Sequence, residues 1–271
     1  MKAGRLRHVR EVLGTLVSRE IGVLTNAIAF NFLLCLFPLL VFVAALSRQL
    51  PGIGRRAGTG LLLVLQELIP FGHEAMAESV RGLTKTAAGL QIFALLLIVW
   101  GSSGIFMPVE MALNRAWGGR ANRSFLKSKV LATFMTLAGG LLGLASIAIT
   151  VWVRTYGRDW PFVVRYSSKA TALLLSYLLF FLIYRLVPDA AVGSRTALRA
   201  ALIAGTAWEV AKYAFVARLP AMGLEAFYGP LAFSVSLILW AYISSLVLVF
   251  GALMVSAEMP SESRAPRRSR R

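Results

Sequence analysis

Hydrophobic side chains are concentrated in six long runs, which are separated by shorter segments rich in charge, glycine and proline. The runs lie near residues 24–46, 89–107, 130–153, 170–187, 196–217 and 230–255. About 20 helical residues cross a bilayer core of about 30 Å. Lipid offers no partners for free backbone groups, so a spanning run must be helical. The pattern therefore predicts an all-α membrane protein, a bundle of six transmembrane helices that forms a single domain over residues 1–258.

Three further segments lie outside these runs. Residues 9–23 carry apolar side chains at helical spacing and are predicted to lie flat on the membrane surface. Residues 47–88 form a long external segment that is predicted to contain two short helices over the outer mouth of the bundle; the alternative is a mobile lid. Residues 259–271 have almost no apolar side chains and are predicted to form a disordered basic tail in the cytoplasm.

Composition and charge agree with this class. Hydrophobic residues make up 58% of the chain and charged residues 15%, with 29 basic and 12 acidic side chains and a single cysteine. These values exclude an ordinary soluble enzyme, a disordered chain and a disulfide scaffold. The basic residues lie between the apolar runs, so we expect anionic lipid headgroups rather than nucleic acid as partners. They are more numerous on the side of the N-terminus, which predicts that both termini are cytoplasmic.

The strongest candidate for a functional site is the pair Glu209 and Lys212 in the fifth run. The two residues are three apart and share one helix face. A charge in hydrocarbon is costly, so such residues face the bundle interior, pair, or line a wet cavity. One interpretation is a substrate-binding site for an anionic headgroup or a proton-coupled step. The alternatives are a self-neutralised structural pair and a Lys212 side chain that extends to the outer interface.

Polar residues in the first run are further candidates for substrate binding. Asn26 and Asn31 need hydrogen-bond partners if they are buried. They would either hold helices together or line a path, and packing is the simpler interpretation of each. Pro38 removes a backbone hydrogen bond and predicts a kink, which would open space beside Asn31.

A second candidate region follows the second run. Glu110 and Asn114 are four residues apart on one helix face and could form an inner gate or a partner surface. Trp117 is predicted to anchor this amphipathic continuation at the membrane interface, and Gly118 to end it. In the third run, Gly139 and Gly143 form a small-xxx-small pattern that indicates close helix packing and leaves the oligomeric state open.

No constellation for catalysis or for a cofactor is visible. The two histidines and two aspartates are far apart in the sequence and lie outside the apolar runs. No zinc-peptidase, dithiol, phosphate-loop or serine-hydrolase motif occurs. We therefore expect no resident metal, no cofactor and no hydrolase, ATPase or nuclease activity.

Several stretches together resemble the YihY/virulence factor BrkB family of bacterial inner-membrane proteins, and they follow the family order along nearly the whole chain. They are residues 26–41 (NAIAFNFLLCLFPLLV), 112–118 (ALNRAWG), 207–215 (AWEVAKYAF), 228–233 (YGPLAF), 239–245 (LWAYISS) and Gly251. The resemblance implies a six-span protein of the bacterial plasma membrane. It implies no catalytic residues. Members are suspected of transport, including movement of envelope lipids, and some carry the name ribonuclease BN.

Two functions from different classes remain open. A transporter or lipid translocase would carry a polar groove lined by Asn26, Asn31, Glu209 and Lys212, with basic rims that attract anionic headgroups. A membrane scaffold would bind envelope-biogenesis proteins and have a closed, dry bundle in which Glu209 and Lys212 contact only protein. An RNA-processing enzyme would need a cluster of metal ligands that the sequence does not supply.

Overall fold

The computed structural model describes residues 11–12, 14–16, 18–47, 71, 91–119, 124–156, 161–190 and 192–256. All regular structure in these residues is helical. The six long helices have 25 to 32 residues each, which corresponds to at least about 37 Å at 1.5 Å per residue. They are α2 (Arg19–Ser47), α5 (Gln91–Trp117), α6 (Phe125–Tyr156), α7 (Pro161–Leu186), α8 (Ser194–Arg218) and α10 (Ala232–Ser256).

Each of the six long helices covers most of one apolar run, so the all-helical class is confirmed for the described residues. Two stretches of the described chain combine the length and hydropathy of a membrane span. They are Arg19–Leu36, with a mean hydropathy of 1.3, and Leu224–Ser256, with a mean hydropathy of 2.3. A shorter apolar helical stretch is Leu173–Leu186. The six-span topology stays a prediction.

Several predicted segments lie outside the described residues. These are the external segment 47–88, apart from Ser47 and Phe71, and the basic tail 259–271. The surface segment 9–23 is described only in part; it is helical at residues 11–12 and 14–16, and α2 begins at Arg19, earlier than the predicted span. Pro38 lies inside α2, which continues to Ser47. The space predicted beside this proline involves side chains outside the described set.

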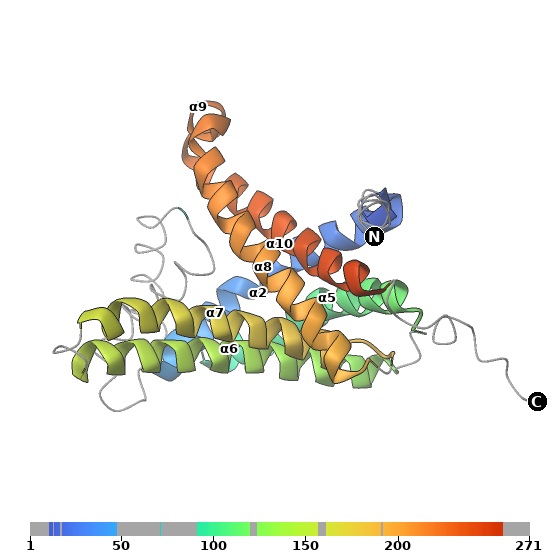
Figure 1. Ribbon diagram of the computed structural model, residues 1–271, viewed down its shortest axis with the longest axis horizontal. Helices are drawn as coiled ribbons and strands as arrows, with labels where there is room; N and C mark the ends of the chain where they lie inside the picture. The colour runs from blue at the N-terminus through green and yellow to red at the C-terminus, as the bar shows by residue number, and fades with distance from the viewer. Residues whose placement is uncertain are drawn as a thin grey trace, which may run out of the picture.

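The helices form two groups that diverge from a shared end (Figure 1). α6 and α7 lie side by side, and α8 and α10 form a hairpin that departs from them. The tip of the hairpin consists of three short helices: η1 (Pro220–Met222), α9 (Leu224–Tyr228) and η2 (Gly229–Leu231). α2 packs against α5 and α10, and α8 contacts α7. α10 therefore joins α8 to α2 and α5 at the centre of the bundle.

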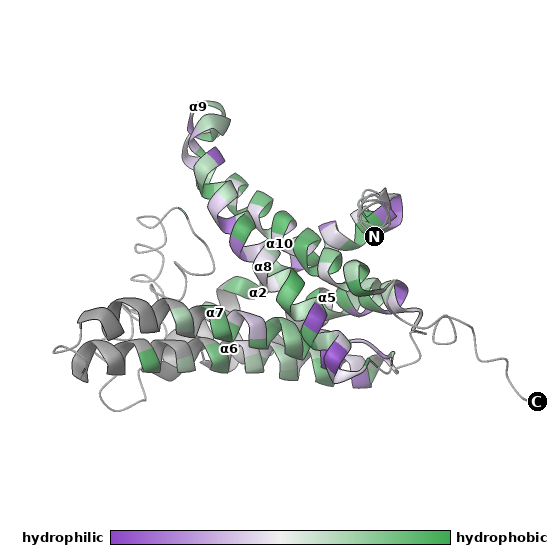
Figure 2. Cartoon of the chain, viewed as in Figure 1, coloured by the Kyte–Doolittle hydropathy of each residue, from purple (hydrophilic) through white to green (hydrophobic). Residues whose placement is uncertain are grey.

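The shared end is where α2, α6 and α8 begin and where α5, α7 and α10 end. We call it the basic end, because its exposed side chains include Arg115, Lys127, Arg185, Arg195 and Arg199. Arg115 forms an exposed ion pair with Glu20, which links the end of α5 to the start of α2. Figure 2 shows hydrophilic positions at this end and further ones along α8 towards the tip of the hairpin. Phe30, Phe134 and Leu174 are each at least 60% exposed on the bundle surface, as expected for contact with lipid.

Small residues let the helices approach closely at three described positions. A Cβ atom at Gly104 in α5 would overlap the amide of Asn31 in α2. One at Gly205 in α8 would overlap the ring of Tyr177 in α7. One at Gly251 in α10 would lie 2.6 Å from Ala204 Cβ and 3.0 Å from Ala200 O, both in α8. Membrane helices associate through such close packing, because burial of apolar surface drives little association in lipid.

Candidate functional site

Glu209 and Lys212 form an ion pair in the C-terminal half of α8. Lys212 Nζ lies 2.8 Å from Glu209 Oε1, and it also lies 4.6 Å from the centre of the Trp208 ring. The Lys212 side chain is 8% exposed and that of Glu209 is 19% exposed. Lys212 therefore turns into the protein, and the interpretation in which it extends to the outer interface is wrong.

Aromatic side chains surround this pair. Trp208 lies 6.0 Å from Trp240 and 6.3 Å from Phe180, measured between ring centroids. One helical turn beyond Lys212, Phe215 packs against Trp240 at 5.4 Å and against Phe71 at 5.3 Å. Such surroundings have a low dielectric constant, so the attraction between the two charges is stronger than it would be in water.

The pair is electrically neutral as a whole but incompletely hydrogen-bonded. Glu209 Oε1 is buried and has no hydrogen-bond partner among the described residues apart from its ion contact with Lys212. The indole of Trp208 donates a 3.2 Å hydrogen bond to Ser244 Oγ in α10 and is fixed against that helix. The carboxylate is the more accessible member, so a ligand that reaches this site would meet Glu209 first.

The structure places the two asparagines of α2 elsewhere. Asn31 donates from Nδ2 to Ala27 O at 2.8 Å and packs its amide against Gly104, so it belongs to the contact between α2 and α5. Asn26 is exposed on the bundle surface. In the part of the chain that the structure describes, neither amide is hydrogen-bonded to Glu209 or Lys212.

At the basic end, Asn114 links α5 to the connection between α7 and α8. Its Oδ1 accepts hydrogen bonds from the backbone N–H groups of Asp189 at 2.8 Å and Ala190 at 3.3 Å, in the connection between α7 and α8. Asn114 Nδ2 is buried without a partner among the described residues, and Glu110, one turn earlier, is 7% exposed. A Cβ at Gly119 would lie 2.6 Å from Asn114 Oδ1, which leaves room only for glycine. Asn114 therefore holds the end of α5 against the connection between α7 and α8, and this contact lies apart from the ion pair on α8.

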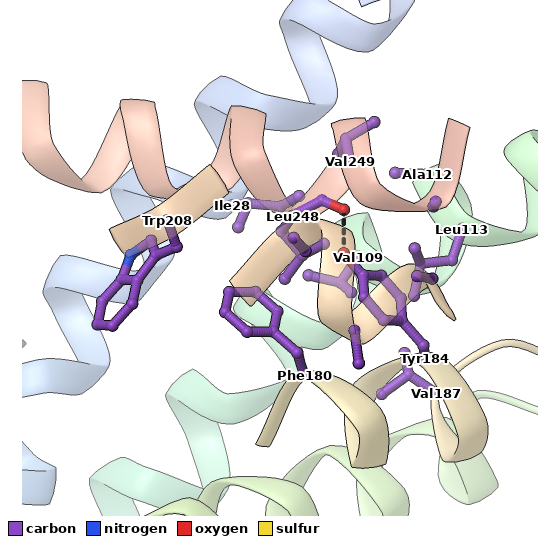
Figure 3. Packing of buried hydrophobic residues seen from close by; sticks show 14 of the residues in the cluster. Ile28, Val109, Ala112, Leu113, Phe180, Tyr184, Val187, Trp208, Leu248 and Val249 are labelled. Atoms are coloured by element: carbon purple, nitrogen blue, oxygen red, sulfur yellow. Dashed lines mark hydrogen bonds between the residues drawn. The ribbon is translucent and has the colours of Figure 1, made fainter. Parts of the chain in front are cut away.

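Two buried aromatic donors were not identified from the sequence as interior residues. Trp117 is 1% exposed and donates from Nε1 to Ala252 O at 3.0 Å, so its predicted role as an interfacial anchor is wrong. Gly118 does end α5, with a left-handed φ of 69°. Tyr184 is fully buried and donates to Leu248 O at 2.6 Å (Figure 3). Both bonds attach neighbouring helices to backbone carbonyls of α10.

The remaining chemistry of the described residues is sparse. They contain no group of three or more His, Cys, Asp or Glu side chains placed to hold a metal ion. Cys35 is buried and has no disulfide partner. The Glu209–Lys212 pair is therefore the strongest candidate for a functional site among the described residues.

Comparison with known proteins identifies relatives over most of the chain. The family described as Virulence factor BrkB matches residues 12–271. A ribonuclease-like protein of Bacillus subtilis, YfkH, is 24% identical over 241 residues, which cover 83% of this chain and 85% of that protein. A UPF0761 membrane protein of Rhodospirillum rubrum is 27% identical over 267 residues, covering 96% of this chain and 60% of the relative.

A UPF0761 membrane protein of Alkalilimnicola ehrlichii is 29% identical over 252 residues, covering 88% of this chain and 56% of the relative. The chain thus spans little more than half the length of these two membrane relatives. No solved structure matches the chain. The match to residues 12–271, together with the long apolar helices, shows that this chain is a membrane protein of the virulence factor BrkB family.

Proposed function

We propose that this protein is a transporter or translocase of an envelope lipid, or of another substrate with an anionic group, and that Glu209 and Lys212 form its binding site. One observation carries the proposal. The two charges are buried on one helix, 2.8 Å apart, so their contact joins no two helices. Ionisable residues inside a membrane domain are costly and mark substrate pathways by default. An anionic phosphate that enters the site would compete with Glu209 for Lys212.

We further propose that all six long helices span the plasma membrane of a bacterium, with both termini in the cytoplasm. The basic end supports this orientation, because exposed arginines and lysines gather there and positive residues favour the cytoplasmic side. The same residues would attract anionic headgroups to the rim of the bundle. The ion pair on α8 then lies beyond the midplane, nearer the outer leaflet.

A scaffold that binds envelope-biogenesis proteins is the second candidate. The observation in its favour is the enclosure of Lys212, whose ammonium group contacts the Glu209 carboxylate and the Trp208 ring and is only 8% exposed. A site that is closed in this way needs a rearrangement before a substrate reaches it. A transport measurement separates the two candidates.

We do not extend the ribonuclease-like name of the Bacillus relative to this chain. We propose that the protein has no nuclease activity, because a metal-dependent nuclease needs converging acidic or histidine ligands and the described residues hold no group of three or more such side chains. Incubation of the purified protein with labelled precursor tRNA and Mg²⁺ tests this proposal, and cleavage at a defined position would contradict it.

The transport experiment uses purified full-length protein in liposomes and follows the transbilayer movement of an acyl-labelled phospholipid. The variants are Glu209→Gln and Lys212→Met. Glu209→Gln has a matched control with the same chemical change at an exposed site, Glu225→Gln in α9. Size-exclusion chromatography and thermal unfolding show whether each variant is folded.

We expect movement with the wild-type protein and with the Glu225→Gln control, and its loss in both site variants. Movement that persists in folded site variants would remove the pair from the mechanism. No movement with the wild-type protein would reject the lipid translocase and favour the scaffold.

A further inference from the structure

We infer that the headgroup taken by this site is zwitterionic and carries a primary ammonium group as well as a phosphate, as a phosphoethanolamine headgroup does. This inference rests on the proposed function and specifies its substrate class. The phosphate would bind Lys212, and the ammonium group would bind Glu209 beside the Trp208 ring. The internal ion pair is thereby exchanged for two ion pairs with the ligand.

Charge balance is the first argument. The site holds one carboxylate and one ammonium group, both at least four-fifths buried, so its net charge is zero. A purely anionic headgroup would pair with Lys212 but leave the Glu209 carboxylate buried without a counter-ion. Removing one partner of a buried ion pair is strongly destabilising, because it leaves an uncompensated charge. A zwitterion adds one charge of each sign and leaves the site neutral.

The existing cation contacts are the second argument. An ammonium group already occupies the position between the Glu209 carboxylate and the Trp208 ring, namely that of Lys212 itself, at 2.8 Å and 4.6 Å. Carboxylate and indole face together form a cation site in which the electrostatic attraction of the ring adds to the ion pair. An incoming ammonium group of the same chemistry replaces Lys212 at these contacts when Lys212 turns to the phosphate.

Hydrogen bonding is the third argument, and it separates primary from quaternary ammonium groups. Glu209 Oε1 is buried and has no hydrogen-bond partner among the described residues besides its ion contact. A primary ammonium group offers three N–H donors, whereas a trimethylammonium group offers none. An ethanolamine headgroup therefore gives the Glu209 carboxylate both a positive charge and hydrogen-bond donors, whereas a choline headgroup gives it only the positive charge. The expected order of movement is phosphatidylethanolamine, then phosphatidylcholine, then phosphatidylglycerol.

The test compares these three phospholipids, each with the same fluorescent acyl chain and an unmodified headgroup, in liposomes that contain the wild-type protein or Glu209→Gln. We expect the wild-type protein to move phosphatidylethanolamine at least about tenfold faster than phosphatidylglycerol. A factor of ten needs only a modest difference in binding free energy between the two headgroups. Glu209→Gln removes the carboxylate that would bind the ammonium group, so the movement of phosphatidylethanolamine should be lost. Glu225→Gln should keep the wild-type order.

Binding provides a second readout that does not depend on the variants. Short-chain phosphatidylethanolamine should raise the melting temperature of the wild-type protein in detergent more than short-chain phosphatidylglycerol does. Equal rates for the three lipids, or faster movement of phosphatidylglycerol by the wild-type protein, would overturn the inference and leave the proposed function standing. Choline and ethanolamine lipids moving equally fast would overturn the hydrogen-bond argument. Movement of none of them would overturn the inference and would also reject the lipid translocase of the proposed function.

Discussion

Substitution of Gly251 by alanine tests whether the three-helix junction at the centre of the bundle is as tight as the structure indicates. Gly251 lies in α10, where its missing side chain leaves space for Ala204 and the backbone of Ala200 in α8 and for the Tyr184 hydroxyl in α7. An alanine Cβ would lie 2.6 Å from Ala204 Cβ and 3.0 Å from Ala200 O. α8 would have to move away from α10, or Tyr184 would have to turn.

The expected loss of stability is the sum of two unfavourable contributions and one favourable contribution. Overpacking of a well-packed core costs about 1–3 kcal/mol. Displacing the Tyr184 hydroxyl weakens its 2.6 Å bond to Leu248 O, which adds about 1 kcal/mol. Alanine is better than glycine in a helix by roughly 0.5–1 kcal/mol, which offsets part of the cost. The net destabilisation is therefore about 1–3 kcal/mol.

The assay is thermal unfolding of purified protein in mild detergent, monitored by intrinsic fluorescence. Gly139→Ala in α6 is the matched control, because a Cβ there would meet only Leu179 Cδ1, at 3.9 Å. We expect a lowered melting temperature for Gly251→Ala, an unchanged or raised one for Gly139→Ala, and partial recovery when Tyr184→Phe is added to Gly251→Ala. A Gly251→Ala protein as stable as the wild type would refute the packing described here.

Two further predictions concern the buried polar contacts at the basic end. Asn114→Ala leaves the N–H groups of Asp189 and Ala190 without their acceptor. We expect the free energy of unfolding to fall by about 2–4 kcal/mol and proteolysis between α7 and α8 to become faster. An unchanged cleavage rate would contradict the role of Asn114 in holding this connection. Trp117→Phe keeps most of the buried ring but removes the hydrogen bond to Ala252 O. In the same unfolding assay, we expect this variant to lose about 1 kcal/mol of stability. Trp117→Ala should lose about 3–5 kcal/mol.

The six long helices were predictable because each corresponds to a long apolar run in the sequence. Six apolar runs of about 20 residues each exceed the length that a soluble core helix needs, and all six correspond to helices in the structure. Their ends were less well predicted. α5 continues past Pro108, since proline is tolerated in helices of membrane proteins, and it ends only where Gly118 adopts a left-handed conformation.

Short elements and helix neighbours were beyond the reach of the sequence. α9 has five residues between Gly223 and Gly229, both with positive φ, so it has too few turns to show a helical period. Nothing in the sequence indicates that Asn31 fills the space beside Gly104. Trp117 was misplaced for the same reason: its helix looks amphipathic until α10 is seen to cover it.

The candidate site was found from the sequence, but its geometry was not. The spacing of Glu209 and Lys212 allowed a pair, an exposed lysine or a ligand site, and the packing of Lys212 against Trp208 excludes the exposed lysine. The indole is fixed by Ser244 and by Trp240, both in α10, so the direction of the Lys212 side chain depends on contacts with another helix.

The polar contacts inside the bundle divide into two kinds, and the division bears on function. Those that join helices use neutral donors: Tyr184 binds Leu248 O, Trp117 binds Ala252 O, and Ser245 binds Thr25 O at 3.0 Å. Neutral groups suit this role because they join two helices without the cost of burying a charge. The Glu209–Lys212 contact does the opposite, since it buries two charges and stays within one helix. Replacing a buried ion pair by well-packed apolar side chains is often neutral or stabilising, and this supports the proposal that a charged ligand takes the place of the internal contact.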